Sequence, residues 1–361
     1  KIYSKSETGV FYALVSMLQI SNSENGQVKE CFIHDYPKFL WRGMHLDCAR
    51  QFYSVKQIIK LLNLMSIFKL NRFHWHLTDN EAWRLDLKSY PNLANDLSFR
   101  GYGLKVPSTY GGGIGPTGGI YKKKDINKIL KHAKSLCIEV MPEIDLPAHS
   151  WALVSNFKKL QEKNDLSWKN VKGGYLNNTI NPALDYTWVF VKKVVSEVSK
   201  IFDFEYFHIG VDERPKNAWT RSPSINKLMK KNNIKNIDNI QDYFVNRIQN
   251  ILKIHKKKSA AWNEAVTKSN ESININKNCL IFAWENRKKG IEAAKKGFDV
   301  IMCPAQKCYL DMAHNKSSHE NGLVWAGVID TKDIFLWNPL KNLENKVKNK
   351  IIGIQAQLWS E

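Results

Sequence analysis

The sequence predicts an α/β protein of the (β/α)8 barrel (TIM barrel) class with a short N-terminal segment before it. Eight short apolar runs rich in β-branched and aromatic residues recur along its 361 residues, and stretches with helical periodicity separate most of them. Such alternation is typical of parallel strands joined by right-handed crossovers. The runs extend from residue 41 to residue 359, a span within the roughly 200 to over 400 residues of this fold.

The elements follow in order along the chain. The predicted strands are 41–47, 73–78, 138–145, 206–212, 259–262, 280–284, 300–304 and 351–359. The predicted helices are 54–69, 125–136, 183–201, 237–255 and 287–297. In the first helix, Val55, Ile58, Leu62 and Met65 recur at the spacing of one helix face.

Two stretches lie outside this alternation of strands and helices, and we expect the chain to end early. Residues 1–35, with a predicted helix over 10–20, are expected to be the remnant of a preceding domain, and 36–361 to form the barrel. The chain begins at Lys1 and stops at Glu361, directly after the eighth strand, so we expect a truncated barrel without its closing helix. The glycine-rich residues 101–119 predict a βα loop, because no Gly-Lys-Ser/Thr follows to make a phosphate loop.

Composition excludes several classes of protein. The chain has 54 Lys and Arg against 34 Asp and Glu, a net charge of +20. Because the lysines are scattered in short runs among asparagines, solvated faces explain the charge better than a nucleic-acid footprint, and no nucleic-acid partner is expected. No apolar stretch approaches the roughly 20 residues of a membrane span. An extracytoplasmic compartment is expected.

The six cysteines predict neither a metal site nor a cofactor. They lack Cys-x-x-Cys spacing, and three of them border or lie in apolar runs, where a thiol behaves as a small buried hydrophobe. The even number permits disulfides without arguing for them.

Carboxylates and tryptophans follow the predicted strands where each one ends. Barrel chemistry collects at the C-terminal strand ends, and core packing alone would favour Val, Ile and Leu there. Carboxylates bind sugar hydroxyls and cleave glycosidic bonds, and indole faces pack against pyranose rings, so this rim suggests a sugar site. Asp212-Glu213, after the fourth strand, is the most informative pair, since one acid can stay neutral as a proton donor while the other stays charged.

Several motifs in register resemble glycoside hydrolase family 20, the β-N-acetylhexosaminidases, and in detail its bacterial branch. The resemblance covers essentially all of 10–361. Its segments are 42–50 (RGMHLDCAR), 73–79 (FHWHLTD) with Trp83-Arg84, 141–149 (MPEIDLPAH), 208–213 (HIGVDE), 261–264 (AWNE), 282–284 (FAW), 309–311 (YLD) and 357–361 (QLWSE).

The resemblance implies substrate-assisted catalysis. In this family the 2-acetamido oxygen of the substrate attacks the anomeric carbon, an oxazolinium ion forms, and water opens it with net retention. By position in the motifs, Glu213 would be the general acid/base and Asp212 would orient the acetamido N–H. Tyr309 would donate a hydrogen bond to the acetamido oxygen. Asp79 and His149 would form a pair that relays to Glu213 and tunes its pKa.

The resemblance also implies the residues that bind the sugar. Trp262, Trp284 and Trp359 would wall the acetamido methyl group. The hydroxyls of the terminal sugar would be clamped by Arg42, Asp311 and Glu361, which implies exo-action on a glycan ending in β-linked GlcNAc or GalNAc. Trp325 would be a stacking platform for the next sugar.

Other polar residues of these motifs are assigned structural roles. His74, His76 and His208 are expected to bond neighbouring backbone or carboxylates, and Glu143 and Asp145 to be acids behind the site. Arg50, Arg84 and Glu264 are expected to form ion pairs at the barrel rim.

The sequence departs from the family pattern at Val211, Ala82 and Asn263. Val211 replaces a small residue before Asp212 and restricts the backbone there. No group that performs the chemistry is lost, so activity is expected.

Three other hypotheses stay open at this point. One is a weak or inactive N-acetylhexosamine-binding protein on the same scaffold, supported by Val211 and the trimmed ends. Another is a nucleic-acid-associated protein, and the third is a glycosidase with a carboxylate nucleophile about 5–5.5 Å from Glu213.

Overall fold

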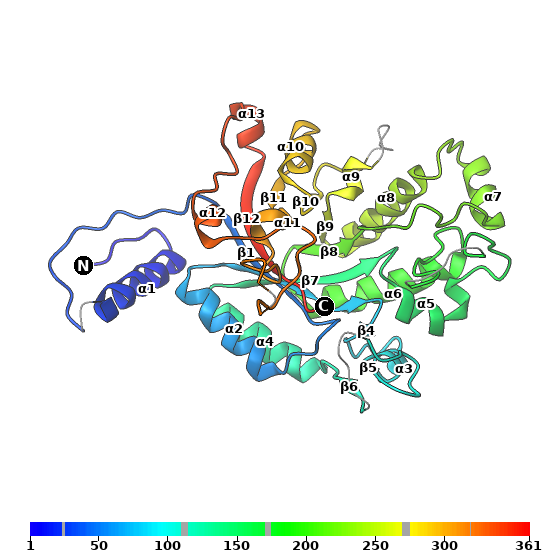
Figure 1. The fold of residues 1–361 in the computed structure, drawn as a ribbon, viewed down its shortest axis with the longest axis horizontal. Helices are drawn as coiled ribbons and strands as arrows, with labels where there is room; N and C mark the ends of the chain where they lie inside the picture. Colours follow the sequence, from blue (N-terminus) through cyan, green and yellow to red (C-terminus); the bar gives the residue numbers. More distant parts are fainter. Residues whose placement is uncertain (24–25, 110–114, 170–174, 269–274, 318) are drawn as a thin grey trace.

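The barrel strands form one closed parallel sheet in the computed structural model, which describes residues 1–23, 26–109, 115–169, 175–268, 275–317 and 319–361. The order around the barrel is β1-β12-β11-β10-β9-β8-β7-β2, and β2 pairs with β1 to close it. The predicted (β/α)8 barrel is therefore confirmed (Figure 1).

All eight predicted strands are present, with ends that differ from the expected ones by two residues at most. They are β1 (Trp41–Asp47), β2 (Arg72–His76), β7 (Glu139–Leu146), β8 (Tyr206–Gly210), β9 (Lys258–Trp262), β10 (Leu280–Ala283), β11 (Val300–Met302) and β12 (Ile351–Leu358).

The five predicted helices are also present. They are α2 (Val55–Ile67), α4 (Lys123–Ser135), α6 (Asp185–Ile201), α8 (Asn239–Ile254) and α10 (Arg287–Lys295). The start of α2 shows why such helices form where they do: the Ser54 hydroxyl accepts from the Gln57 N–H and the Gln57 side chain accepts from the Ser54 N–H, which caps the first turn.

Shorter elements decorate the loops. The helices are α3 (Pro91–Leu97), α5 (Trp151–Asn156), η1 (Lys158–Leu160), α7 (Pro223–Lys231), α9 (Glu264–Thr267), α11 (Ala305–Cys308), α12 (Thr331–Phe335) and α13 (Asn345–Lys348). Two small hairpins are β3 (Thr78–Asp79) with β4 (Ala82–Trp83), and β5 (Phe99–Arg100) with β6 (Thr117–Gly118). Residues 110–114 of the predicted glycine-rich loop lie outside the described residues.

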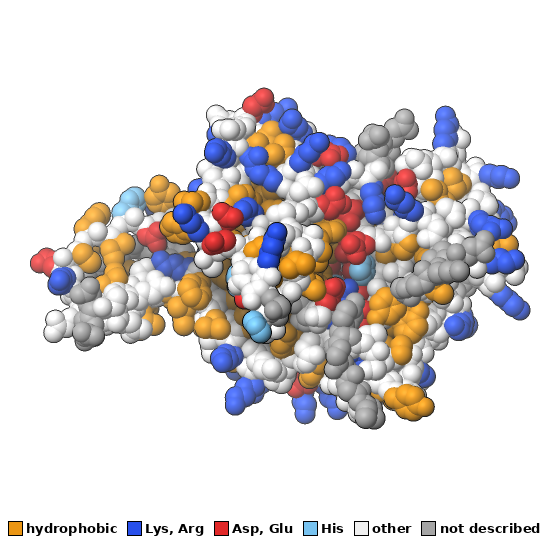
Figure 2. Space-filling view, viewed as in Figure 1, with side chains coloured by type: hydrophobic (Ala, Val, Ile, Leu, Met, Phe, Trp, Pro, Cys, Tyr) orange, Lys and Arg blue, Asp and Glu red, His pale blue; other side chains and the backbone are white. Residues whose placement is uncertain are grey.

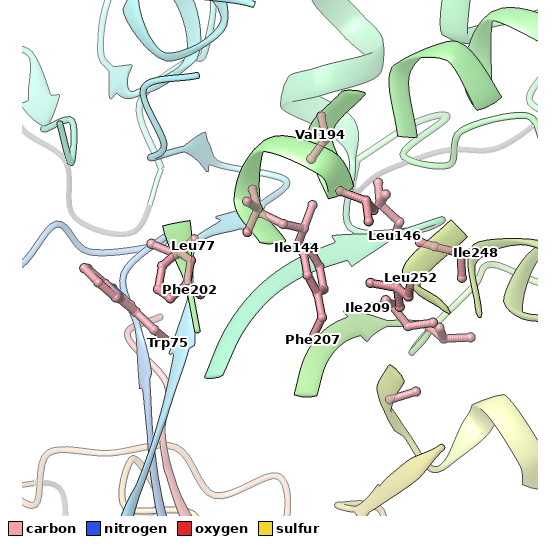
Figure 3. Packing of buried hydrophobic residues seen from close by; sticks show 14 of the residues in the cluster. Trp75, Leu77, Ile144, Leu146, Val194, Phe202, Phe207, Ile209, Ile248 and Leu252 are labelled. Atoms are coloured by element: carbon pink, nitrogen blue, oxygen red, sulfur yellow. The ribbon is translucent and has the colours of Figure 1, made fainter. Parts of the chain in front are cut away.

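The main apolar core lies between the outer face of the barrel and the surrounding helices. Figure 3 shows Phe207 and Ile209 of β8 beside Ile248 and Leu252 of α8, and all four side chains are buried. Removing such large apolar surfaces from water stabilises the fold by roughly 1.5–3 kcal/mol per side chain. The packing fixes the strands, and with them the geometry of the strand ends.

The interior of the barrel is unusually polar. His45, His74, His76 and His208 point inward around Glu143, and all five are fully buried. Barrel interiors are ordinarily filled by Val, Ile and Leu, so these groups must find their partners in one another.

The N-terminal segment forms α1 (Glu7–Ser23), which confirms the helix expected over 10–20. In Figure 1 it lies to one side of the barrel, near α2. The Gln19 amide donates to the Ile67 carbonyl, and the Lys69 ammonium donates to the Ser16 hydroxyl. Among the described residues, no helix has both the length and the apolar character of a membrane span.

Candidate active site

A pocket lies at the C-terminal ends of the barrel strands. It is a cavity of about 230 Å³ that opens to solvent, and it collects residues that are far apart in the sequence. Its lining residues are Arg50, His149, Asp212, Glu213, Trp262, Trp284, Tyr309, Asp311, Trp325, Trp359 and Glu361. All the predicted site residues except Asp79 and Arg42 line it.

The acidic pair is placed by an irregular end to β8. Gly210 and Val211 have φ of +70° and +82°, and Glu213 has φ of +42°. These left-handed residues turn the chain sharply, so that adjacent side chains both reach the pocket instead of pointing to opposite faces of an extended strand. Asp212 lies buried at the bottom, whereas the Glu213 side chain stays 58% exposed.

Asp79 lies behind the pocket and reaches it through His149. Asp79 Oδ1 lies 2.9 Å from His149 Nδ1. On its other side, His149 Nε2 lies 3.4 Å from Glu213 Oε2 and 3.7 Å from Asp212 Oδ2. The imidazole therefore joins the buried carboxylate of Asp79 to the acidic pair.

The protonation of these groups follows from their neighbours. Burial lowers the pKa of His149, but the carboxylates of Asp79 and Asp212 outweigh it and hold that pKa well above its usual value. The hydrogen bond from His149 lowers the pKa of Glu213, while burial raises the pKa of Asp212. These directions leave the proton on His149, and Glu213 as a carboxylate. Glu213 must be protonated to act as a general acid, so the proton lies on its neighbour.

Three indoles and a phenol form one wall. The ring centroids of Trp262 and Trp359 lie 5.9 Å apart, and those of Tyr309 and Trp359 lie 6.2 Å apart. The Trp284 ring stacks with that of Tyr309 at 6.5 Å. Trp262 Nε1 donates to Glu143 Oε1 at 2.9 Å, which fixes its ring. The wall is apolar, rigid and suited to a small methyl-bearing group.

Trp325 lies at the mouth of the pocket. Its side chain is 56% exposed, and its ring centroid lies 5.8 Å from that of Tyr309 and 6.2 Å from that of Trp284. An exposed indole at a pocket mouth offers a face to a further ring of a longer ligand.

Arg50 brings a guanidinium cation to the pocket. Its guanidinium lies 3.0 Å from Asp79, 2.8 Å from Glu81 and 3.6 Å from Glu361. Burial lowers the pKa of Arg50, but these carboxylates raise it well above its usual value, so the charge is permanent. Burial also raises the pKa of Asp311, across the pocket, to about 6.

The prediction that Arg42 clamps the sugar is wrong. Arg42 lies near the N-terminal start of β1, at the end of the barrel opposite to the pocket. There its guanidinium donates to the Lys69 and Phe39 carbonyls and lies 5.4 Å from the Tyr12 ring. Since catalytic groups collect at the C-terminal strand ends, the polarity of the strand already favoured Arg50.

Glu264 is a second residue whose part the sequence did not indicate. Its Oε1 accepts from the Glu213 backbone N–H at 3.2 Å, and its Oε2 accepts from Trp284 Nε1 at 2.9 Å. Burial, and then the charge of Asp212, raise the pKa of Glu264 to about 8, although two accepted hydrogen bonds favour the carboxylate. Glu264 thus ties the acidic pair to the indole wall.

Within the described part of the chain, three-residue groups with metal-ligating atoms occur in two places. His45, His74, His76 and His208 share Glu143 in the barrel interior, and Asp145, His149 and Asp212 meet at the pocket, with His76, Asp79 and Asp145 as a further group between the two. Nitrogen–oxygen distances of 2.5 to 2.9 Å around Glu143 are those of direct hydrogen bonds. Glu143 is therefore held by direct contacts with His74, His76 and His208, whereas both ring nitrogens of His45 are buried without a hydrogen bond.

Comparison with known proteins identifies relatives of the whole barrel. The family model described as glycosyl hydrolase family 20, catalytic domain, matches residues 39–361. A β-hexosaminidase of Vibrio furnissii is 32% identical over all of this chain and 59% of its own length. The N,N'-diacetylchitobiase of Vibrio harveyi is 28% identical over 98% of this chain and 50% of its own length.

A solved structure of the same family has the same fold. The exo-β-N-acetylglucosaminidase of Vibrio harveyi, solved with N-acetylglucosamine, superposes with a TM-score of 0.90 at 33% identity. The match covers 99% of this chain and 56% of the other. This chain thus spans a little over half the length of these relatives.

Proposed function

The chain belongs to glycosyl hydrolase family 20, and we propose that it is an exo-acting, retaining β-N-acetylhexosaminidase that removes terminal β-linked N-acetylglucosamine or N-acetylgalactosamine. The observation that carries the proposal is the placement of Asp212, buried at the base, and Glu213, exposed at the rim, in one indole-walled pocket, with His149 within 4 Å of both. The relatives named as hexosaminidases support the same reaction class.

The geometry fits attack by the substrate on itself. The wall of Trp262, Trp284 and Trp359 holds the acetamido methyl group, and the Tyr309 hydroxyl donates to the acetamido oxygen. Asp212 accepts from the acetamido N–H, which aims the oxygen at the anomeric carbon. Such an intramolecular nucleophile gains a large effective molarity when it is held in place.

Proton transfer belongs to Glu213. In the first step it gives a proton to the glycosidic oxygen as the bond to the leaving group breaks and the oxazolinium ring closes. In the second step it takes a proton from the water that opens the ring. Its exposed side chain, at the rim of the pocket, can reach both the leaving oxygen and the incoming water.

The closed base of the pocket favours exo-action. Arg50 and Glu361 lie 3.6 Å apart, and both line the cavity with Asp311. These charged groups bind the 3-, 4- and 6-hydroxyls of a terminal sugar, while Trp325 at the mouth stacks on the next one. The non-catalytic alternative is not favoured, because the groups for both steps line one pocket.

Hydrolysis of 4-nitrophenyl β-N-acetylglucosaminide tests the proposal. We expect turnover by the wild type and a loss of about 10²–10⁴-fold in kcat for Glu213→Gln, since the general acid is removed. Glu205→Gln is the matched control, because Glu205 is an exposed glutamate at the opposite end of β8, paired with Lys258. It should keep wild-type turnover.

An inhibitor and a second nitrophenyl glycoside separate the mechanisms. A thiazoline analogue of the oxazoline should inhibit as a transition-state mimic does, with an inhibition constant roughly 10²-fold or more below the substrate KM. 4-Nitrophenyl β-glucoside, which lacks the acetamido group, should not be cleaved. Cleavage of the glucoside, or equal turnover by Glu213→Gln and wild type, would refute the proposed mechanism.

A further inference from the structure

A continuous line of ionisable side chains runs from the middle of the barrel to the pocket. Glu143 Oε2 lies 2.5 Å from His76 Nδ1, and His76 Nε2 lies 2.9 Å from Asp79 Oδ2. Asp79 Oδ1 lies 2.9 Å from His149 Nδ1, and His149 Nε2 lies 3.4 Å from Glu213 Oε2. His76 is hydrogen-bonded through both ring nitrogens, and His149 is hydrogen-bonded through Nδ1 while its Nε2 is in ion-pair contact with Glu213.

The charges alternate in sign along this line. The acid members have lowered pKa values: that of Glu143 lies well below its usual range, and those of Asp79 and Glu213 are lowered as well. The pKa values of His76 and His149 are held well above theirs. Burial opposes every one of these shifts, and the neighbouring opposite charges outweigh it. The two histidines are therefore imidazolium ions between carboxylates.

Glu143 also has neighbours other than His76. His208 Nδ1 lies 2.8 Å from Glu143 Oε1, and His74 Nε2 lies 2.9 Å from Oε2, while His45 Nε2 is 4.0 Å away. Burial lowers the pKa of His74 to about 4 and that of His45 well below its usual value, so neither is charged at neutral pH. His76 supplies the cation that Glu143 faces on the pocket side.

The other members also face charged groups outside the line. Asp79 is 3.0 Å from the Arg50 guanidinium. The carboxylate of Asp212 is 3.7 Å from His149, and the buried carboxyl of Asp145 lies in the same cluster. Burial, and then Asp212, raise the pKa of Asp145 well above its usual value, so Asp145 adds no charge at neutral pH.

We propose that Glu143 and His76 are positioning residues that set whether His149 or Glu213 holds the proton these two share. The inference rests on the proposed function of Glu213. The carboxylate of Asp79 favours the proton on His149. The imidazolium of His76 offsets part of that negative charge. It therefore narrows the free-energy difference between the state with the proton on His149 and the state with the proton on Glu213.

Glu143 completes the arrangement. His76 is fully buried, and a buried imidazolium without an anion loses its proton to avoid desolvation. Glu143 holds that proton in place at 2.5 Å. When His149 Nε2 passes its proton to Glu213 Oε2, the His149 ring becomes neutral. The His76 imidazolium then remains as a cation beside Asp79.

His76→Gln and His74→Gln form a matched pair that tests the inference. Both histidines lie on β2, two residues apart, and both face Glu143 Oε2, but only His76 also reaches Asp79. A glutamine amide can occupy the place of Nε2 toward Asp79 without the charge.

The pH profile of kcat/KM for 4-nitrophenyl β-N-acetylglucosaminide is the measurement. In His76→Gln, Asp79 holds the His149 proton more firmly, so less enzyme carries it on Glu213. We expect kcat to fall about tenfold, and the descending limb, where the pair loses its last proton, to move about half a pH unit or more upward. His74→Gln, which removes an uncharged ring, should shift neither.

A role in packing alone predicts a different result. Loosening Asp79 would weaken its hold on His149, lower the pKa of His149 and move the limb to lower pH. A limb that stays in place or moves down in His76→Gln, or equal losses in the two variants, overturns the inference. Thermal unfolding of each variant shows which of them fold.

Nitrogen-15 spectra of the histidine rings in the wild type test the same inference without turnover. We expect His76 and His149 to stay doubly protonated at pH 7, and a neutral His76 at pH 7 would refute the role of its charge. If the wild type fails to cleave the nitrophenyl substrate, the proposed function fails. The ring titration of His149 in wild type and His76→Gln still decides whether the line of charges exists.

Discussion

At the scale of single residues, two arginines in one motif have opposite positions. Arg42 and Arg50 are separated by the length of β1, so one lies at the bottom of the barrel and the other in the pocket. Arg50 compensates the buried carboxylates of Asp79 and Glu81, whereas Arg42 donates to the Lys69 and Phe39 backbone carbonyls.

The pair gives a direct prediction. Arg50→Gln leaves several buried carboxylates without a cation, so we expect the free energy of unfolding to fall by about 3–5 kcal/mol and kcat/KM to fall about 10²-fold. Arg42→Gln loses two hydrogen bonds far from the pocket, and should cost about 1–3 kcal/mol with wild-type kcat/KM. Denaturant unfolding and steady-state kinetics measure both. An equal kinetic loss in the two variants would contradict the placement of Arg50.

At the scale of one element, the end of β8 positions the acidic pair. Gly210 has φ of +70°, and a Cβ built on it would lie 1.7 Å from Asp145 Oδ1. The glycine is required twice, by its backbone conformation and by the close approach of a buried side chain. Val211, which follows it with φ of +82°, is fully buried in the main core, and its packing holds the unusual backbone.

Gly210→Ala should therefore disturb both stability and catalysis. The new methyl group must push Asp145 or the strand end away, which displaces Asp212, and we expect a fall of about 10²-fold in kcat from a misplacement of about 1 Å. Gly103→Ala is the control, because Gly103 has φ of +73° and nothing within 4 Å of its Cβ position. It should cost only about 1–2 kcal/mol of stability, read by thermal unfolding, with kcat unchanged. A fully active Gly210→Ala would show that the strand end tolerates the shift.

At the scale of the whole molecule, charge is divided between surface and interior. Lysines and arginines lie mostly around the periphery in Figure 2, and acidic side chains gather near the middle of that face. The net charge of +20 is thus a surface property, while the pocket is rich in acids. The interior holds its own set of paired charges around Glu143 and Asp79.

These interior charges predict how stability depends on pH. His76 and His149 have folded pKa values well above 6.5, so the stability that their protonation adds is complete below pH 6.5 and is lost as pH rises toward the folded pKa values. The raised pKa values of Asp145 and Glu264 act in the same direction. We expect the free energy of unfolding to fall between pH 6.5 and 8, by about 1.4 kcal/mol per pH unit for each such proton.

Denaturant unfolding at several pH values measures this slope. The His76→Gln variant should show a shallower fall over the same range, because one of the retained protons is gone. A stability that is level or rises from pH 6.5 to 8 would show that the interior histidines are neutral.

The sequence by itself determined the number, order and type of the main elements. Short apolar runs and the helical period of 3.6 residues are local signals, and eight alternating units leave a parallel barrel as the natural way to bury them. It also placed Asp212, Glu213 and the indoles near one another, because the C-terminal ends of parallel strands meet at one rim. The motifs resembling a known family supplied the roles.

Only the tertiary structure decided which side chains touch. Trp262 and Glu143 are 119 residues apart and share a hydrogen bond because β9 and β7, which flank β8, both turn these side chains into the barrel interior. The same register brings His76 between Glu143 and Asp79, and Arg50 rather than Arg42 into the pocket. Such contacts depend on the stagger between neighbouring strands in the closed barrel. Local sequence patterns do not determine that stagger.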